Sequence, residues 1–229
     1  MDSAADIAIE GAGLFHIFRE TTLETVALRG AALTLRRGTW ASVTGPSGSG
    51  KSTLLHVMAG LLEPSGGSVL LDGVDLTRLP APERAQRRRQ RIGVVLQRDN
   101  LHPLFDVAGN IQLPLRLDAR NGAASRERAR VLLERVGLAD RGHHTPAQLS
   151  GGEAQRAAIA VALAAAPAIV LADEPTGELD EHTGDAVLDL LGEIRDEGTA
   201  VLTVTHNPAV AERADRRLQM LDGLVVDDD

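Results

Sequence analysis

The sequence predicts an α/β fold built on parallel strands, and three apolar segments carry that prediction. The first, Trp40–Thr44, leads into a glycine-rich loop and then into residues with helical spacing at Ser52–Ala59. The other two, Ala168–Ala172 and Ala200–Thr205, are separated by a helical pattern over His182–Arg195. Short apolar runs that alternate with helices are typical of parallel strands whose two faces are both buried. We therefore expect a layered α/β domain.

The loop after the first strand reads GPSGSGKS over residues 45–52 and fits the P-loop pattern G-x-x-x-x-G-K-[ST]. Its glycines let successive backbone N–H groups turn toward a phosphate chain, and the helix N-terminus favours the same anion. The pattern predicts that Lys51 reaches the β- and γ-phosphates and that the Ser52 hydroxyl holds Mg²⁺. An ordinary loop can match it by chance, but the flanking strand and helix argue against that alternative. The residues expected to line the nucleotide here are Gly45, Pro46, Ser47, Gly48, Ser49, Gly50, Lys51, Ser52 and Thr53.

A second glycine-rich segment, Leu149–Glu153, reads LSGGE and opens another helix far downstream. Ser-Gly-Gly alone is a common turn, but at a helix N-terminus it can offer N–H donors to a phosphate. One nucleotide needs one P-loop. A second such segment that cannot fold onto the first suggests a site completed by another copy of the chain.

Two carboxylates follow the apolar run at Ala168–Ala172. Open α/β sheets bind ligands at the carboxyl ends of their strands. We expect Asp173 to hold Mg²⁺ opposite Ser52, and Glu174 to orient and deprotonate the water that attacks the γ-phosphate. A solvated Asp–Glu pair at a strand end is the alternative, and the P-loop upstream argues against it.

With these motifs in this order, the chain resembles the ATP-binding subunits of ABC transporters over nearly its whole length. Residues 149–156 (LSGGEAQR) match the family signature, and residues 177–180 (GELD) match the D-loop, which crosses a dimer interface. The resemblance implies that Phe18 stacks on adenine, that Gln97 contacts Mg²⁺ or the attacking water, and that His206 contacts the γ-phosphate. The implied fold is a P-loop NTPase core of ABC type with an N-terminal antiparallel β subdomain and an inserted α-helical subdomain.

The same resemblance assigns roles to the whole set of motif residues. ATP and Mg²⁺ are the implied cofactors, and the implied partners are a second copy, held head to tail by ATP, and integral membrane permease subunits. Hydrolysis would rest on Lys51, Gln97, Glu174 and His206, and the metal on Ser52, Gln97 and Asp173. The further residues expected at the nucleotide, in part from the second copy, are Ser150, Gly151, Gly152, Glu153 and Asp180.

The particular residues within these motifs indicate one branch of the family. The segments GPSGSGKSTLL, LADEPTGELD and TVTHN are similar to those of the branch that serves lipoprotein release, macrolide and peptide efflux, and cell division. Such a subunit would be cytoplasmic and peripheral on the inner face of the membrane. A soluble ABC ATPase in cofactor assembly is the alternative, since those proteins are single domains of similar size. Export or mechanotransmission is the function that this resemblance implies.

Four positions depart from the usual family residues. Leu96 stands where Phe is usual, Val161 where Arg is common, Asn207 where Asp is usual, and Thr39 where Glu is frequent. None of these changes removes a phosphate, metal or base contact. We therefore expect hydrolysis to survive them.

Composition is consistent with this interpretation. The chain has 229 residues, of which 43% are hydrophobic, and no apolar run approaches the roughly 20 residues of a bilayer span. The N-terminus lacks the pattern of a secretory signal, and the absence of cysteine excludes disulfides and thiolate metal sites. A net charge of −8 argues against general nucleic-acid affinity.

The basic cluster at Arg84–Arg91 could suggest a nucleic-acid patch, but we expect the solvated face of a short helix. The His143–His144 pair has no carboxylate at metal-ligand spacing.

The pattern along the chain predicts one domain with two parts. Residues 1–97 and 167–229 would form the nucleotide-binding core with its β subdomain, and residues 98–166 the helical subdomain that carries the signature. In the first part we expect antiparallel strands from Asp6 to Leu35 joined by a turn at Gly30, and a hairpin at Asp72–Gly73. The remaining expected elements are helices at Asn110–Leu117 and Ser125–Val136, and a final hairpin at Leu218–Val226.

Overall fold

The computed structural model of the chain describes residues 6–20, 23–120 and 122–227. Its larger sheet has the strand order β10-β9-β3-β8-β7-β6, and its smaller sheet has the order β2-β1-β4-β5. The larger sheet consists of β3 (Trp40–Thr44), β6 (Ile92–Val95), β7 (Ile169–Asp173), β8 (Ala200–Val204), β9 (Arg216–Leu221) and β10 (Leu224–Asp227). The smaller consists of β1 (Ile7–Glu20), β2 (Leu23–Arg36), β4 (Gly66–Leu71) and β5 (Val74–Asp75).

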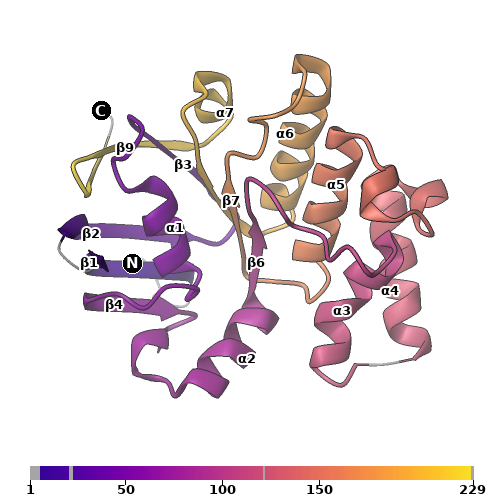
Figure 1. Cartoon of the computed structure of the whole chain (residues 1–229), viewed down its shortest axis with the longest axis horizontal. Helices are drawn as coiled ribbons and strands as arrows, with labels where there is room; N and C mark the ends of the chain where they lie inside the picture. Colours follow the sequence, from indigo (N-terminus) through magenta and orange to yellow (C-terminus); the bar gives the residue numbers. More distant parts are fainter. Residues whose placement is uncertain (1–5, 21–22, 121, 228–229) are drawn as a thin grey trace.

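Helices surround these sheets. The α-helices are α1 (Lys51–Met58), α2 (Ala81–Arg91), α3 (Val107–Leu117), α4 (Ala123–Arg135), α5 (Gly151–Ala162), α6 (Glu181–Asp196) and α7 (Pro208–Glu212). Short 3₁₀ turns lie at Leu76–Arg78, Ala139–Arg141 and Pro146–Gln148. Figure 1 shows the smaller sheet on one side of the molecule and α3, α4 and α5 on the other, with β6 and β7 between them. Within the described residues, no helix is both long enough and apolar enough to cross a membrane.

The central strands are parallel, as the sequence predicts. β9, β3, β8, β7 and β6 pair in parallel, and β10 adds an antiparallel edge. In β7, Val170 and Ala172 pack in the cluster that includes α3 to α6, whereas Ile169 and Leu171 pack in the cluster that includes α1 and the smaller sheet. The alternation follows from the period of two along a strand. Since both faces are covered, the strand sequence is apolar throughout.

The predicted turn at Gly30 is wrong. Gly30 lies within β2, and the residues that would join β1 to β2 include 21 and 22, which lie outside the described residues. Arg29 pairs with Phe15 and Ala31 pairs with Leu14, so Gly30 is an extra residue between two consecutive pairs. Its φ of 99° is the left-handed conformation that such a β-bulge favours, and only glycine adopts it without strain. The preference of glycine for a positive φ, which suggested a turn in the sequence, serves a β-bulge in the structure.

The other expected elements are confirmed within a few residues. α3 and α4 cover the two predicted helices of the middle segment, and no strand is assigned in the described residues between 98 and 166. Gly137 follows α4 with a φ of 68°, which suits the C-terminal position where a helix ends in a left-handed residue. Tight hairpins at Asp72–Gly73 and Asp222–Gly223 connect β4 to β5 and β9 to β10.

Helix α2 departs from the solvated face expected of its arginines. None of its residues is fully buried, yet its side chains bind neighbouring elements. Arg84 pairs with Glu63, and Arg88 donates to the carbonyl of Gly60 at 3.0 Å. Two further pairs, Arg89 with Asp118 and Arg91 with Asp72, connect α2 to the end of α3 and to the β4–β5 turn. α2 is therefore an ionic connection between the sheets and the helical region.

Candidate functional site

The P-loop leaves β3 and enters α1 through glycines that their surroundings require. Gly45 and Gly50 have φ values of 150° and 106°. A Cβ on Gly45 would lie 2.3 Å from the carbonyl oxygen of Met220, and one on Gly50 would lie 2.4 Å from that of Ala27. Neither backbone can move cheaply, because both belong to strands of the sheets. The Lys51 ammonium lies over the loop and donates to the carbonyls of residues 45 and 46 at 2.8 and 2.9 Å.

The end of β7 places a carboxylate beside the start of α1. Asp173 is buried, and this burial raises the pKa of its carboxyl, whereas a hydrogen bond from the Ser52 hydroxyl acts in the opposite direction. The predicted Ser52–Asp173 pair is therefore assembled. A hydroxyl and a carboxylate beside an open loop are oxygen ligands of the kind that Mg²⁺ accepts together with water and phosphate. The hydroxyl of Ser49, in the same loop, is buried and has no hydrogen-bond partner among the residues that the structure describes.

Glu174 follows β7 and lies within contact of the segment that follows β8. Its Oε1 accepts from the backbone N–H of His206 at 3.0 Å and lies 2.7 Å from Nδ1 of the same residue. Its Oε2 accepts from the hydroxyl of Thr205 at 2.8 Å. Glu174 itself has a φ of 46°, an uncommon conformation for a residue other than glycine. The structure thus brings together Glu174 and His206, the two residues expected near the γ-phosphate.

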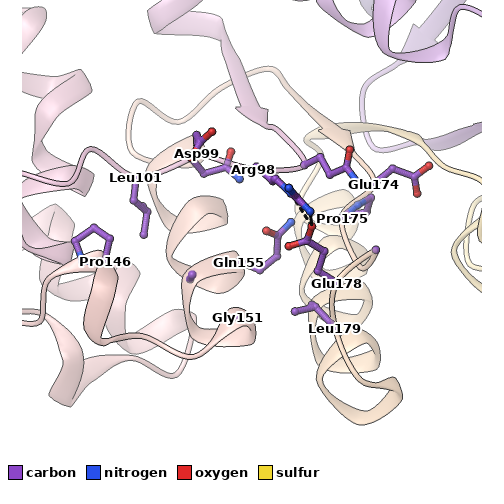
Figure 2. A pocket seen from close by; sticks show the side chains of 14 residues that line it. Arg98, Asp99, Leu101, Pro146, Gly151, Gln155, Glu174, Pro175, Glu178 and Leu179 are labelled. Carbon is purple, nitrogen blue, oxygen red and sulfur yellow. Dashed lines mark hydrogen bonds and ion pairs between the residues drawn. The ribbon is translucent and has the colours of Figure 1, made fainter. Parts of the chain in front are cut away.

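A cavity of about 340 Å³ opens beside Glu174 and joins three segments that are distant in the sequence. Gln97 lies on its wall, next to the residues that follow β6, the start of α5 and the D-loop. Figure 2 shows Arg98 and Glu178 facing each other across this cavity, at 2.7 Å from Nε to Oε1. Asn100 fixes the chain just before Gln97, because its amide both donates to and accepts from the Leu96 backbone at 2.7 Å.

The signature segment forms a preorganised helix N-terminus. The Ser150 hydroxyl accepts from the Glu153 N–H at 3.3 Å, and the Glu153 carboxylate accepts from the Ser150 N–H at 2.8 Å. Arg141 also donates to this carboxylate, at 2.8 Å. The backbone hydrogen bond from Ser150, followed by that from Arg141, lowers the pKa of Glu153 to about 2. This reciprocal capping box leaves the exposed Gly151 at the first position of α5.

Not all of the predicted residues meet within one chain. α5 lies apart from α1 in Figure 1, so the signature segment does not reach the P-loop of the same copy. Asp180 caps α6 through Thr183.

Phe18 lies in β1 with 42% of its surface exposed, and its ring packs edge-on against His16. His143 and His144 lie in the loop before the signature, where His143 is fully open to solvent and 3.7 Å from Asp106.

Sequence reasoning missed three contacting residues. Arg98 and Arg141 bind the D-loop and the signature segment through ion pairs, and nothing in their local sequence indicates these distant partners. Thr205 is different, because a hydroxyl-bearing residue between an apolar strand and a motif histidine could have been singled out. Its signal is a polar residue at a position that the strand end buries.

Comparison with known proteins agrees with this geometry. A family model described as ABC transporter matches residues 28–177. The lipoprotein-releasing system ATP-binding protein LolD of Paramagnetospirillum magneticum is 48% identical over 212 residues, which is 92% of this chain and 93% of the relative. The macrolide export ATP-binding/permease protein MacB of a Shewanella species is 38% identical over 221 residues, which is 96% of this chain but 34% of that longer protein.

Solved structures share the fold. A dimeric post-hydrolysis state of the ATP-binding cassette MJ0796, bound to ADP and phosphate, superposes with a TM-score of 0.88 at 37% identity and covers 95% of this chain. The family model spans both the P-loop and the Asp173–Glu174 pair, the two parts that the fold brings to one sheet edge. By sequence, fold and arrangement of motifs, this chain belongs to the ABC transporter family.

Proposed function

We propose that the chain is the ATP-hydrolysing motor subunit of a transporter of the lipoprotein-release type. One observation carries this proposal: the P-loop, the Asp173–Glu174 pair and His206 lie at the carboxyl ends of three adjacent parallel strands, β3, β7 and β8. Groups that can donate hydrogen bonds to phosphate, a carboxylate that can bind a metal and a carboxylate that can orient a water thus share one edge of the sheet. The LolD relative, which aligns nearly end to end, supports lipoprotein release over drug efflux.

Mg²⁺ fits the oxygen ligands at the end of β7 and the start of α1. The Ser52 hydroxyl and the Asp173 carboxylate, already hydrogen-bonded, would hold the ion, with Gln97 as a third ligand from the cavity wall. When bound, the ion would neutralise charge on the phosphate oxygens. The backbone N–H groups of the P-loop and the Lys51 ammonium would position the same phosphates.

Glu174 would act on the attacking water. A carboxylate accepts a proton from water when it lies within hydrogen-bond distance of it, and its geometry decides its efficiency. His206 has 73% of its side chain exposed, so it can turn from Glu174 toward a γ-phosphate. Phe18, exposed on β1, would stack on the adenine ring.

The complete site would need two copies. The signature helix lies apart from the P-loop of its own chain, and its N-terminus is capped and exposed at Gly151. A second copy placed head to tail would present Ser150, Gly151, Gly152 and Glu153 to the nucleotide, with Asp180 at the interface. The dimeric cassette with ADP and phosphate is consistent with this arrangement. Residues 98–166 would move as one helical part, and permease subunits would hold the dimer at the inner face of the membrane.

Glu174→Gln tests the proposal. It removes the base but keeps the size and the acceptor oxygen, so ATP turnover should fall by about a hundredfold or more while ATP still binds. The ATP-bound dimer should then accumulate on size-exclusion chromatography. Glu193→Gln on the exposed side of α6 is the matched control and should behave like the wild type. Turnover that persists in Glu174→Gln would overturn the assignment of the base.

The transport part needs a separate experiment. Tagged Glu174→Gln protein would be recovered from its native cells in mild detergent with ATP and Mg²⁺, and its partners identified by mass spectrometry. A multi-span membrane protein with an extracytoplasmic domain would support the transporter. Recovery of only soluble assembly factors would favour the alternative, a soluble ABC ATPase, and would leave the ATPase itself unaffected.

A further inference from the structure

We infer that Thr205 is a positioning residue for Glu174, an inference that rests on the proposed role of Glu174 as the base. Thr205 is fully buried at the end of β8. Its hydroxyl donates to Oε2 of Glu174 at 2.8 Å. It touches no part of the P-loop in the hydrogen bonds of the described residues, so it would act on the reaction through Glu174.

The direction of this hydrogen bond is fixed by a neighbour. The backbone N–H of Asn207 donates to the Thr205 hydroxyl oxygen at 3.0 Å, and an N–H can only donate. The single hydroxyl proton is therefore left for the carboxylate. Asn207 is itself held, because its side chain caps α7 by accepting from Ala209. The Thr205 backbone is held as well, by a bond from its N–H to the Val43 carbonyl on β3.

The two oxygens of Glu174 have unequal partners. Oε1 is held by His206, whose side chain is mostly exposed, whereas Oε2 is held by a hydroxyl that solvent does not reach. When His206 turns toward a γ-phosphate, its ring leaves Oε1, which keeps the bond from the His206 backbone N–H at 3.0 Å and has a lone pair open to a water. The Thr205 bond to Oε2 does not depend on that turn. Thr205 therefore leaves Oε1 as the oxygen that faces the water.

The chemical step then has a defined acceptor. An O–H bond of the attacking water breaks and its proton passes to Oε1 of Glu174. The water oxygen bonds to the γ-phosphorus, and the bond between that phosphorus and the bridging oxygen of ADP breaks. Without the Thr205 hydroxyl, the His206 backbone N–H would be left to restrain the carboxylate against rotation about its last torsion, which is broad for this type of side chain. Fewer encounters would then place Oε1 on the water.

A set of four variants tests this role. Thr205→Val keeps the shape and removes the donor, whereas Thr205→Ser keeps the donor and removes a methyl group. Thr203→Val is the matched control, since it also removes a buried hydroxyl, two residues earlier and within β8. That hydroxyl accepts from the Trp40 indole at 3.1 Å, whereas the Thr205 hydroxyl donates to Glu174. Glu174→Gln is measured beside them.

We expect Thr205→Val to lower kcat by about tenfold or more with little change in KM for ATP, because a hydrogen bond to a charged group is lost. Thr205→Ser should stay near the wild type, and Thr203→Val should lose stability but keep kcat. Thr205→Val should also accumulate the ATP-bound dimer on size-exclusion chromatography, whereas a merely misfolded site would weaken that dimer. If Thr205→Val does not fold, Thr205→Ala and Thr205→Ser carry the same comparison.

The outcomes separate the two proposals. A Glu174→Gln protein that still hydrolyses ATP at the wild-type rate would overturn the proposed function. An inactive Glu174→Gln beside a fully active Thr205→Val would overturn the positioning role alone. The same holds if Thr205→Ser loses as much kcat as Thr205→Val, since the methyl group and not the hydroxyl would then matter.

Discussion

Gly152, the second glycine of the signature, is held by contacts within its own chain. It is buried at the start of α5, where a Cβ would lie 2.1 Å from Cγ2 of Thr183 on α6. Thr183 cannot turn away freely, because its hydroxyl donates to Asp180 at 2.7 Å and its N–H to the same carboxylate at 3.0 Å. Gly152→Ala must therefore separate the two helices or break the cap of α6.

The size of the effect follows from that contact. Overpacking a tight core site costs about 1–3 kcal/mol. Replacing glycine by alanine in a helix returns up to about 1 kcal/mol, and less in the first turn. We expect Gly152→Ala to lower the free energy of unfolding by about 1–2 kcal/mol. Thr183→Ser removes Cγ2 and keeps the capping hydroxyl, so in that background Gly152→Ala should cost almost nothing.

Urea unfolding of the four proteins of this double-mutant cycle measures the coupling. Gly192→Ala is the control, since a Cβ there meets nothing within 4 Å and should stabilise α6 whichever residue stands at 183. An equal cost of Gly152→Ala in both backgrounds would refute the packing argument. The stability cost would then arise from something other than the Thr183 methyl group. The ATPase activity of the Gly152→Ala, Thr183→Ser double variant would show separately whether the glycine is also needed for phosphate binding.

The structure predicts the effects of three other substitutions on stability or ATP binding. Arg89→Ala should lower the free energy of unfolding by about 2 kcal/mol or more in urea, because it leaves the Asp118 carboxylate, which is 4% exposed, without its ion pair. Glu153→Gln should destabilise by about 1 kcal/mol, because the amide oxygen can still accept from the Ser150 N–H but the charge that pairs with Arg141 and favours the helix N-terminus is lost. Because the folded pKa of Glu153 is lowered to about 2, that difference should be constant above about pH 4.5 and fade toward pH 2 in pH-dependent unfolding. Gly50→Ala should abolish ATP binding, measured by calorimetry, because its Cβ would meet the Ala27 carbonyl and its φ is positive.

The parallel strands of the central sheet could be predicted from the sequence because both faces of that sheet are buried. A run such as Ile169–Asp173 has no polar interruption until the site begins, so the same feature predicts both the strand and the place where the ligand binds. Gly30 shows the limit of such signals. A glycine with positive φ serves a turn or a bulge equally well, and only the pairing with β1 distinguishes them.

Contacts between distant residues could not be read in this way. Arg89 and Arg91 have partners that follow them or precede them by many residues, and only the fold brings Asp118 and Asp72 to α2. A charge cluster looks the same in the sequence whether it is solvated or paired. The candidate site was predictable where a motif names its residues, as at Lys51 and Asp173, and was missed at Arg98 and Arg141, whose ion-pair partners lie on distant segments.

The register of the parallel strands explains why those loops meet. Val43 pairs with Val204 and Val204 with Asp173, so the residues that follow β3, β7 and β8 begin at one level of the sheet. The N–H of Glu174 donates to the Val204 carbonyl at 2.9 Å, which continues the pairing one residue beyond the strand. A slip of β8 by one residue would turn Thr205 to the opposite face and carry His206 away from Glu174. Because β7 and β8 are buried on both faces, such a slip would exchange the side chains of two packed cores. The packing of the apolar residues therefore sets the geometry of the polar ones, and the precision of the site depends on a register that no site residue determines.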